Sequence, residues 1–201
     1  MTTTKQGTSH PILISGDAGP TPVGVLAGLS IDLSKRGLPV GHPVRVTVID
    51  RSDRSLIRLR QLPTIDSYVT IDDLDGIDRL LEQLDERTLL EPRVTGLDLL
   101  VINELARLLD FLTRTGRADL AQRLGDLVAR HDGDRLMVAA SCSAPDQLPS
   151  EVRSQFRASL DCGPDGSGRL ANPTGESVID LREWSPDRVT SAVASIIQPA
   201  A

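Results

Sequence analysis

The sequence predicts a three-layer α/β/α fold, in which a mostly parallel sheet lies between two layers of helices. Short apolar runs alternate along the chain with longer segments in which apolar residues recur every three or four positions. The short runs have the length of strands, and the longer segments have the period of an amphipathic helix. Several runs lack polar alternation, which is typical of strands covered on both faces, and strands that alternate with helices pair in parallel.

The first strand and the first helix are predicted from the N-terminal part of the chain. Residues 12–14 form an uninterrupted Ile-Leu-Ile run, and Gly16 follows it in a turn. We expect a helix over residues 23–36 that ends before the Gly-Leu-Pro sequence after it. Thr21 is a good N-cap residue, and Pro22 suits the first helical position because its missing N–H costs nothing there.

The same reasoning predicts the other elements in order. We expect strands at residues 44–50, 67–70, 97–102 and 135–141, with edge strands at 158–162 and 177–181. We expect helices at residues 74–84, 104–114, 117–130, 151–156 and 187–197, the first of them capped by Asp72 or Asp73. An arginine-rich loop or short helix is predicted over residues 51–60, and a turn region over 163–175.

Length and charge limit the class of protein. The 201 residues predict a single domain over residues 10–201, preceded by a flexible polar segment at 1–9. A net charge of −6, with arginines interspersed among acids, argues against a nucleic-acid surface. No apolar stretch approaches the roughly 20 residues that a membrane-spanning helix needs, so we expect no direct membrane insertion. Without a secretory signal, we expect a cytoplasmic location.

Cysteine and histidine spacing predicts no metal site. Cys142 and Cys162 match no ligand pattern, and we expect both to be buried or half-buried free thiols. His10, His42 and His131 lie near predicted element ends without a cysteine or carboxylate at ligand spacing. The chain also lacks the G-x-S-x-G sequence of a serine nucleophile elbow.

The turn after the first strand retains little of a phosphate-binding loop. Such a loop reads G-x-x-x-x-G-K-[ST], because its glycines let backbone amides approach the anion, its lysine reaches the outer phosphates and its hydroxyl holds magnesium. Gly16 matches the first glycine, and Gly19 lies inside the loop, but Thr21, Pro22 and Val23 occupy the second glycine, lysine and hydroxyl positions. Proline has no N–H to donate, and valine cannot bind a hydrated metal. We therefore expect no nucleotide site here.

Four segments resemble the FtsK/SpoIIIE-type P-loop ATPase domain, including the repeated ATPase domains of the type VII secretion protein EccC. They are residues 10–16 before the loop, 44–50 in the second strand, 99–106 in place of the Walker B strand, and 137–141 in place of the strand that carries a polar sensor. The resemblance covers roughly residues 10–180. It implies a RecA-like P-loop NTPase topology.

The resemblance also implies that the ATPase residues are mostly lost. Asn103 stands where the family has the Walker B aspartate, and an amide brings no charge to a cation. Glu104 matches the water-activating glutamate and is retained, but we interpret it as vestigial and as a favourable acid at a helix N-terminus. Residues 142–145 replace a Gln-Arg-Pro-like segment and supply no arginine. We therefore expect a pseudo-ATPase that needs no cofactor.

A fold that loses its chemistry can persist through protein contacts. We expect one or more protein partners, as a homo-oligomer or within a larger ATPase assembly for secretion or translocation. Candidate surfaces are residues 51–60, whose arginines suit an acidic partner, and residues 144–156. Tyr68 and Trp184 are candidate anchors if they are exposed.

Two alternatives remain open at this point. The first is an ATP-binding motor module of a DNA- or protein-translocating ATPase. The second is a dinucleotide-binding domain, because Asp50 ends the second strand where an acid binds a ribose hydroxyl. The glycine spacing does not support the second alternative, because the G-x-G-x-x-G pattern is missing.

Overall fold

A computed structural model describes residues 11–16, 20–40, 44–90, 96–130 and 135–197. Within these ranges, eight strands form one sheet. The strands are β1 (Ile12–Ser15), β2 (Val44–Asp50), β3 (Ile65–Thr70), β4 (Leu97–Ile102), β5 (Leu136–Cys142), β6 (Ala158–Cys162), β7 (Ser167–Asn172) and β8 (Gly175–Asp180). The α-helices are α1 (Pro20–Val40), α2 (Leu74–Leu90), α3 (Leu105–Arg114), α4 (Ala118–Ala129), α5 (Ser150–Arg153) and α6 (Pro186–Ile197). Three short 3-10 helices are η1 (Ile57–Gln61), η2 (Pro145–Gln147) and η3 (Arg182–Trp184).

The sheet has the order β3-β2-β4-β5-β1-β6-β7-β8. Strands β1 to β6 pair in parallel, and β7 and β8 extend the sheet as an antiparallel hairpin. Residues of β4 alternate between the two faces, so Leu100 and Ile102 enter one core while Leu99 and Val101 enter the other. Both faces of the central strands are therefore buried, as their apolar sequence predicts.

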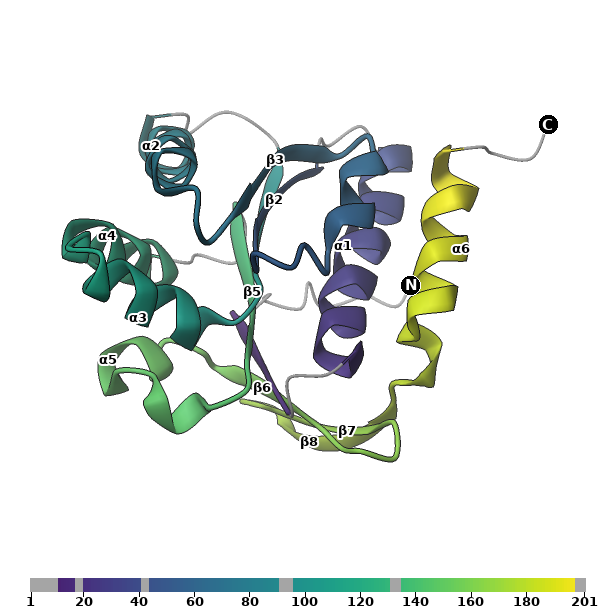
Figure 1. Ribbon diagram of the computed structural model, residues 1–201. Coiled ribbons are helices and arrows are strands. Elements are labelled where there is room, and N and C mark those ends of the chain that lie inside the picture. The colour runs from purple at the N-terminus through teal and green to yellow at the C-terminus, as the bar shows by residue number, and fades with distance from the viewer. Residues whose placement is uncertain (1–10, 17–19, 41–43, 91–95, 131–134, 198–201) are drawn as a thin grey trace, which may run out of the picture.

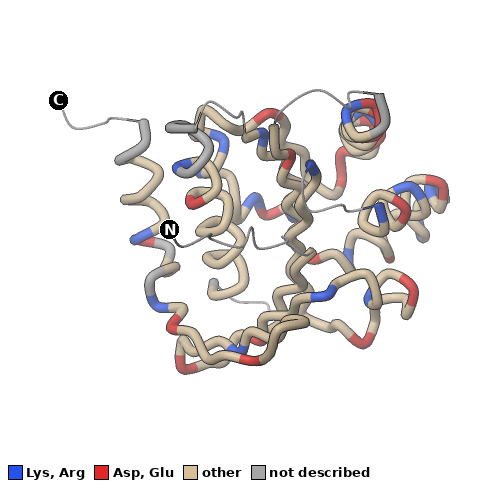
Figure 2. The backbone as a smooth tube through the Cα atoms, turned by 180° about the vertical axis from the view of Figure 1, so that it is seen from behind, with Lys and Arg blue, Asp and Glu red and all other residues tan. Residues whose placement is uncertain are grey.

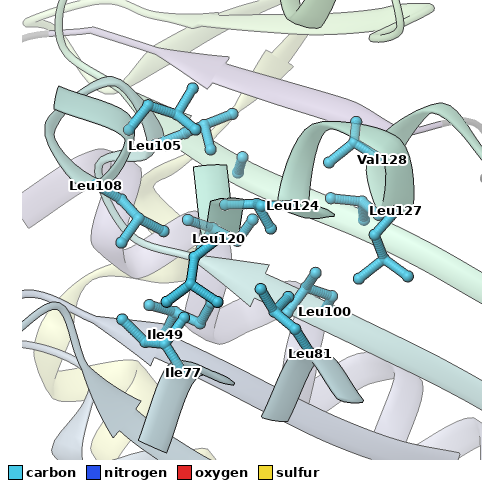
Figure 3. Packing of buried hydrophobic residues seen from close by; sticks show 14 of the residues in the cluster. Ile49, Ile77, Leu81, Leu100, Leu105, Leu108, Leu120, Leu124, Leu127 and Val128 are labelled. Atoms are coloured by element: carbon cyan, nitrogen blue, oxygen red, sulfur yellow. The ribbon is translucent and has the colours of Figure 1, made fainter. Parts of the chain in front are cut away.

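Helices cover both faces of the sheet (Figure 1). Helices α2, α3 and α4 pack on one face, and α1 and α6 pack on the other. Figure 3 shows the first of these cores, in which Leu81 from α2 and Leu124 from α4 pack around Leu100 of β4. Leucine, isoleucine, valine and alanine make up nearly all of the buried hydrophobic set, in accord with the low aromatic content.

The fold class and the element order are confirmed. The predicted strands at 44–50 and 97–102 match β2 and β4, and the predicted C-terminal helix matches α6 to within one residue. Asp73 caps α2, because its carboxylate accepts a hydrogen bond of 2.9 Å from the Gly76 N–H. The proposed arginine-rich segment contains η1.

The predicted bounds of α1 are wrong at both ends. Helix α1 begins at Pro20, before the expected Thr21 cap, and continues past Gly37 to Val40. The helix start still tolerates its prolines, because N–H groups of a first turn have no intrahelical acceptor. A glycine costs only about 1 kcal/mol inside a helix, so Gly37 alone does not end it.

The C-terminal part of the sheet also differs from the prediction. Strand β6 is internal, because it pairs with β1 on one side and β7 on the other. Strand β7 lies within the stretch predicted as a turn region, since its sequence Ser-Gly-Arg-Leu-Ala-Asn is too polar and glycine-containing to signal a strand. Short helix α5 ends three residues earlier than expected.

The charge distribution agrees with the prediction from composition. Figure 2 shows acidic and basic residues interspersed along the backbone. In the part of the chain that the structure describes, no helix has both the length and the apolar character needed to cross a bilayer. The predicted flexible segment at residues 1–9 lies outside the described residues.

Candidate functional site

Four neighbouring parallel strands bring the sequence-predicted site residues to one edge of the sheet. Gly16 follows β1, Asp50 ends β2, Asn103 follows β4, and Ser141 is the penultimate residue of β5. Because β4 and β5 pair Ile102 with Ala140, the next residue of each strand lies at the same level. Ligands of open α/β sheets bind outside this carboxyl edge.

The glycine after β1 has a structural role. Gly16 adopts φ +149°, and a Cβ atom there would lie 3.0 Å from both Cβ and the carbonyl oxygen of Cys162. A side chain at this position is therefore strained and crowded by β6. Ser15, the residue before Gly16, also contacts β6, because its hydroxyl donates a hydrogen bond to Asp161 of that strand. Packing between β1 and β6 is thus sufficient reason for glycine at position 16.

The first turn of α1 includes Pro22, which has no N–H to donate, and Val23, which has no hydroxyl. Thr21 and Pro22 are helical, and Pro22 is buried. Val23 packs against the core between α1 and the sheet. Gly19 lies outside the described residues.

The Asn103 side chain is buried and fully hydrogen bonded. Its amide nitrogen donates to Asp50 Oδ1 and to Ser55 Oγ, each at 2.8 Å. Its amide oxygen accepts a hydrogen bond of 2.9 Å from the Ser141 hydroxyl. Both donors and the acceptor therefore have protein partners, and only 1% of the residue is exposed. This arrangement uses the nitrogen as well as the oxygen, so an aspartate could not reproduce it.

Asp50 is the acceptor at the centre of the cluster. One carboxylate oxygen accepts from the Arg51 N–H at 2.8 Å and from Asn103, and the other accepts from the Leu56 N–H at 2.7 Å and the Tyr68 hydroxyl at 2.5 Å. The residue is fully buried. These hydrogen bonds stabilise a buried carboxylate and hold the loop after β2 against the sheet. None of the carboxylate surface faces solvent.

Burial and the hydrogen bond to Asp50 raise the pKa of Tyr68 above its usual range. The phenol therefore stays protonated and remains a donor to Asp50 throughout the neutral range. Arg60 lies over the Tyr68 ring, 5.6 Å from its centre. Tyr68 is thus half-buried, with its hydroxyl bonded to Asp50, and is not a fully exposed anchor.

Glu104 lies between β4 and α3 in an uncommon backbone conformation. Its φ of 69° and ψ of 63° are left-handed, a region that residues other than glycine rarely adopt. Its N–H donates to the Ser141 hydroxyl at 2.9 Å, and its carboxylate accepts from the Ser143 hydroxyl at 2.8 Å. Only 4% of Glu104 is exposed. The residue is held by two groups of the β5 end.

Together these side chains form a polar cluster, which we define as Asp50, Ser55, Asn103, Glu104, Ser141 and Ser143 together with Tyr68. Its centre is buried, whereas Ser55 and Ser143 are exposed at its rim. Sequence analysis identified Asp50, Asn103 and Glu104 but did not assign a contact to the three serines, Ser55, Ser141 and Ser143. The sequence signal for Ser141 was its place at the end of the segment 137–141, which resembles the strand that carries a polar sensor. Both oxygens of the Asp50 carboxylate beside Asn103 therefore accept hydrogen bonds from the protein itself.

The other predicted positions are dispersed. Cys142 is buried and Cys162 half-buried, and burial raises the pKa of the Cys162 thiol to about 11. Among the described residues, no three His, Cys, Asp or Glu side chains gather as metal ligands. All three histidines, His10, His42 and His131, lie outside the described residues.

Trp184 packs closely against α1 at two glycines, Gly24 and Gly28. A Cβ atom at Gly24 would lie 2.0 Å from the Trp184 carbonyl oxygen, and one at Gly28 would lie 2.0 Å from the indole ring. Two glycines one turn apart therefore let the segment before α6 lie directly on the α1 backbone. Sequence analysis did not predict this contact, and it leaves Trp184 packed.

Comparisons with known proteins identify the fold. No family model matches the sequence, and no curated protein matches it. Solved structures do match: EccC (ATPases 2 and 3) of Thermomonospora curvata, in complex with a signal sequence peptide, has a TM-score of 0.71 at 16% identity over 95% of this chain. EssC (ATPases 2 and 3) from Geobacillus thermodenitrificans has a TM-score of 0.68 at 12% identity over 96% of this chain.

The match covers only part of each of those proteins. It spans 42% of the EccC chain and 45% of the EssC chain. The cytoplasmic domain of the T. curvata type VII secretion ATPase EccC also matches, with a TM-score of 0.65 at 18% identity over 93% of this chain and 27% of that one. The chain therefore has the fold of the ATPase domains of EccC and EssC, as the sequence resemblance predicts.

Proposed function

We propose that the chain is an EccC-like domain that does not hydrolyse ATP and acts through protein contacts in a secretion or translocation assembly. The observation that carries this proposal is the hydrogen bonding of Asn103. Its amide donates to Asp50 and Ser55 and accepts from Ser141, so the position of the metal-binding carboxylate serves the interior of the protein.

The phosphate side of the site supports the same conclusion. Pro22 and Val23 replace the lysine and the hydroxyl residue, and both are packed in the domain. Gly16 has a packing reason to be glycine that is independent of any anion. Lysine and magnesium neutralise most of the charge that develops in phosphoryl transfer, and each such interaction is worth about 3–4 kcal/mol in the transition state. Without both, the chain lacks the main electrostatic stabilisation of that reaction.

The partner is proposed to be another protein of such an assembly. The structure of T. curvata EccC that matches this chain is a complex with a signal sequence peptide. That property belongs to EccC, and for this chain a peptide or protein partner is our proposal. The arginine-rich segment remains a proposed contact for an acidic partner, because Arg54, Arg58 and Arg60 are exposed.

One observation favours an active motor module as the second candidate. Glu104 keeps the residue type of the water-activating glutamate, and it does so in a left-handed conformation that costs about 1–3 kcal/mol. If position 104 had only a structural role, we would expect glycine or asparagine there, because these residues adopt the left-handed conformation at a lower cost. The dinucleotide-binding alternative loses its main support, because the Asp50 carboxylate is fully buried and engaged.

Phosphate release separates the two candidates. The chain is incubated with Mg-ATP, and wild type is compared with Glu104→Gln, which keeps the size of the side chain. We expect no phosphate release above the buffer rate from either protein, because the lysine, hydroxyl and aspartate positions are all changed. Release that is equal in both proteins comes from a contaminating ATPase. Release by wild type that Glu104→Gln abolishes would establish an active motor and disprove the proposal.

A further inference from the structure

A groove lies on the helical layer, between α4 and the segment that contains α5. Its volume is about 520 Å³, which is within the range of about 300–1,000 Å³ for clefts that bind ligands. Leu109 of α3 and Val152 of α5 form apolar walls, and Pro149 lies beside them. Figure 1 shows α3, α4 and α5 grouped at one side of the sheet. None of the residues of the polar cluster lines this groove.

Helix α4 presents a different face to each of its surroundings. Leu120, Leu124 and Leu127 enter the core. Arg123 forms an ion pair of 2.6 Å with Asp78 of α2, which fixes the helix on a second side. The third side faces the groove with Ala118, Ala121, Gln122, Gly125, Asp126 and Ala129. Along this third side Ala121 also packs against the core, and residues of α3 and α5 line the groove beside it.

Small residues make the floor of the groove accessible to a helix. A Cβ atom at Gly125 would meet only Val152 Cγ2, at 3.8 Å, so open space lies above the α4 backbone there. Helices approach to about 8–10 Å between axes, and the shorter distances require small side chains at the contact. An amphipathic helix in an apolar groove is a common mode of recognition, in which apolar residues one turn apart serve as anchors.

The charged residues that line the groove are acidic. Asp126 and Glu151 contribute carboxylates, and none of the described lining residues is cationic. Gln122 donates a hydrogen bond of 3.1 Å to Asp126, which orients that carboxylate. A ligand with Lys or Arg beside its apolar face would complement this rim, whereas an acidic ligand would be repelled.

We propose that this groove binds a basic amphipathic helix of a partner protein, with its small apolar face against α4 and its Lys or Arg residues beside Asp126 and Glu151. This inference rests on the proposed function as an interaction domain and names the surface and the chemistry of the partner. It differs from the arginine-rich segment 51–60, which suits an acidic partner.

The test uses a labelled synthetic peptide of about 15 residues, long enough to form a helix, with Ala and Leu on one face and Lys on the other. Fluorescence anisotropy measures its affinity, and amide chemical shifts locate its site. Three variants are compared with wild type. Glu151→Lys reverses one rim charge, Glu176→Lys makes the same change at an exposed position of β8, and Gly125→Leu fills the groove.

We expect shifts confined to α3, α4 and α5, an affinity about five-fold weaker for Glu151→Lys, and one at least about ten-fold weaker for Gly125→Leu. Glu176→Lys should bind like wild type, and a peptide with Glu in place of Lys should not bind. Shifts elsewhere, an equal loss for Glu151→Lys and Glu176→Lys, equal binding of both peptides or no binding at all would each overturn the inference. None of these results bears on phosphate release, so this inference and the proposed function can fail separately.

Discussion

Replacing Asn103 with aspartate is expected to lower the free energy of unfolding by about 3–5 kcal/mol at pH 7, although aspartate is the residue that a working Walker B strand has at this position. In wild type the Asn103 amide nitrogen lies 2.8 Å from Asp50 Oδ1. In the variant two buried carboxylates would face each other at this distance, without the proton that the amide supplies. Urea unfolding followed by circular dichroism measures the difference.

The loss in the Asn103→Asp variant should depend on pH. Two adjacent carboxylates raise the pKa of one of them in the folded state, above about 3.9 for an unfolded aspartate. The folded variant then binds more protons than the unfolded chain, so its stability relative to wild type falls as pH rises from about 4. The Asp50→Asn/Asn103→Asp double variant should recover part of the loss, because it keeps one amide and one carboxylate. An Asn103→Asp protein as stable as wild type at pH 7 would show that the polar cluster is not essential to the fold.

Replacing Gly28 with alanine is expected to destabilise the domain by about 1–3 kcal/mol, which lowers Tm by roughly 2–12 °C for a chain of this size. The added Cβ would lie 2.0 Å from the Trp184 ring, a distance that requires the ring to move. Since Trp184 is the single tryptophan of the chain, its fluorescence reports this displacement directly. Denaturant unfolding by fluorescence and circular dichroism measures both effects.

Gly125→Ala is the matched control for Gly28→Ala. The two positions are both inside helices, but an added Cβ at Gly125 meets only Val152 Cγ2, at an ordinary 3.8 Å. Alanine is favoured over glycine by about 1 kcal/mol in a helix interior, so this variant should be slightly more stable than wild type. If Gly28→Ala also stabilises the domain and leaves the fluorescence unchanged, the packing of Trp184 on α1 is not as we describe it.

Much of the fold could be predicted because its central strands have a strong local signal. The run Leu99–Ile102 is buried on both faces and contains only apolar residues, which marks it as a strand without knowledge of its neighbours. Strand β7 gave no such signal. It is stabilised by pairing with β6 and by a hairpin in which Asn172 accepts hydrogen bonds from Thr174, so its strand character comes from tertiary contacts.

The candidate site could be predicted in position but not in structure. The ends of β1, β2 and β4 identified Gly16, Asp50 and Asn103, because parallel strands bring such positions to one edge. The hydrogen bonds among them could not be predicted, since Asp50 and Asn103 are 53 residues apart in sequence. The contact of Trp184 with α1 could not be predicted either, because nothing in the sequence near Gly24 or Gly28 indicates which segment will pack there.

Two residues of the candidate site have structural roles inside the domain. Val23 packs against the core between α1 and the sheet, and Asn103 is hydrogen bonded within the polar cluster. Gly16 is required by its contact with Cys162. These contacts therefore stabilise the domain.

Thermal unfolding with and without Mg-ATP tests most directly whether the site excludes a nucleotide. A ligand present at 100 times its Kd stabilises the folded state by about 2.7 kcal/mol, which would raise Tm by roughly 5–10 °C here. We predict that millimolar Mg-ATP changes Tm no more than the same concentration of magnesium chloride does at equal ionic strength. A magnesium-dependent rise of several degrees with ATP would contradict the account.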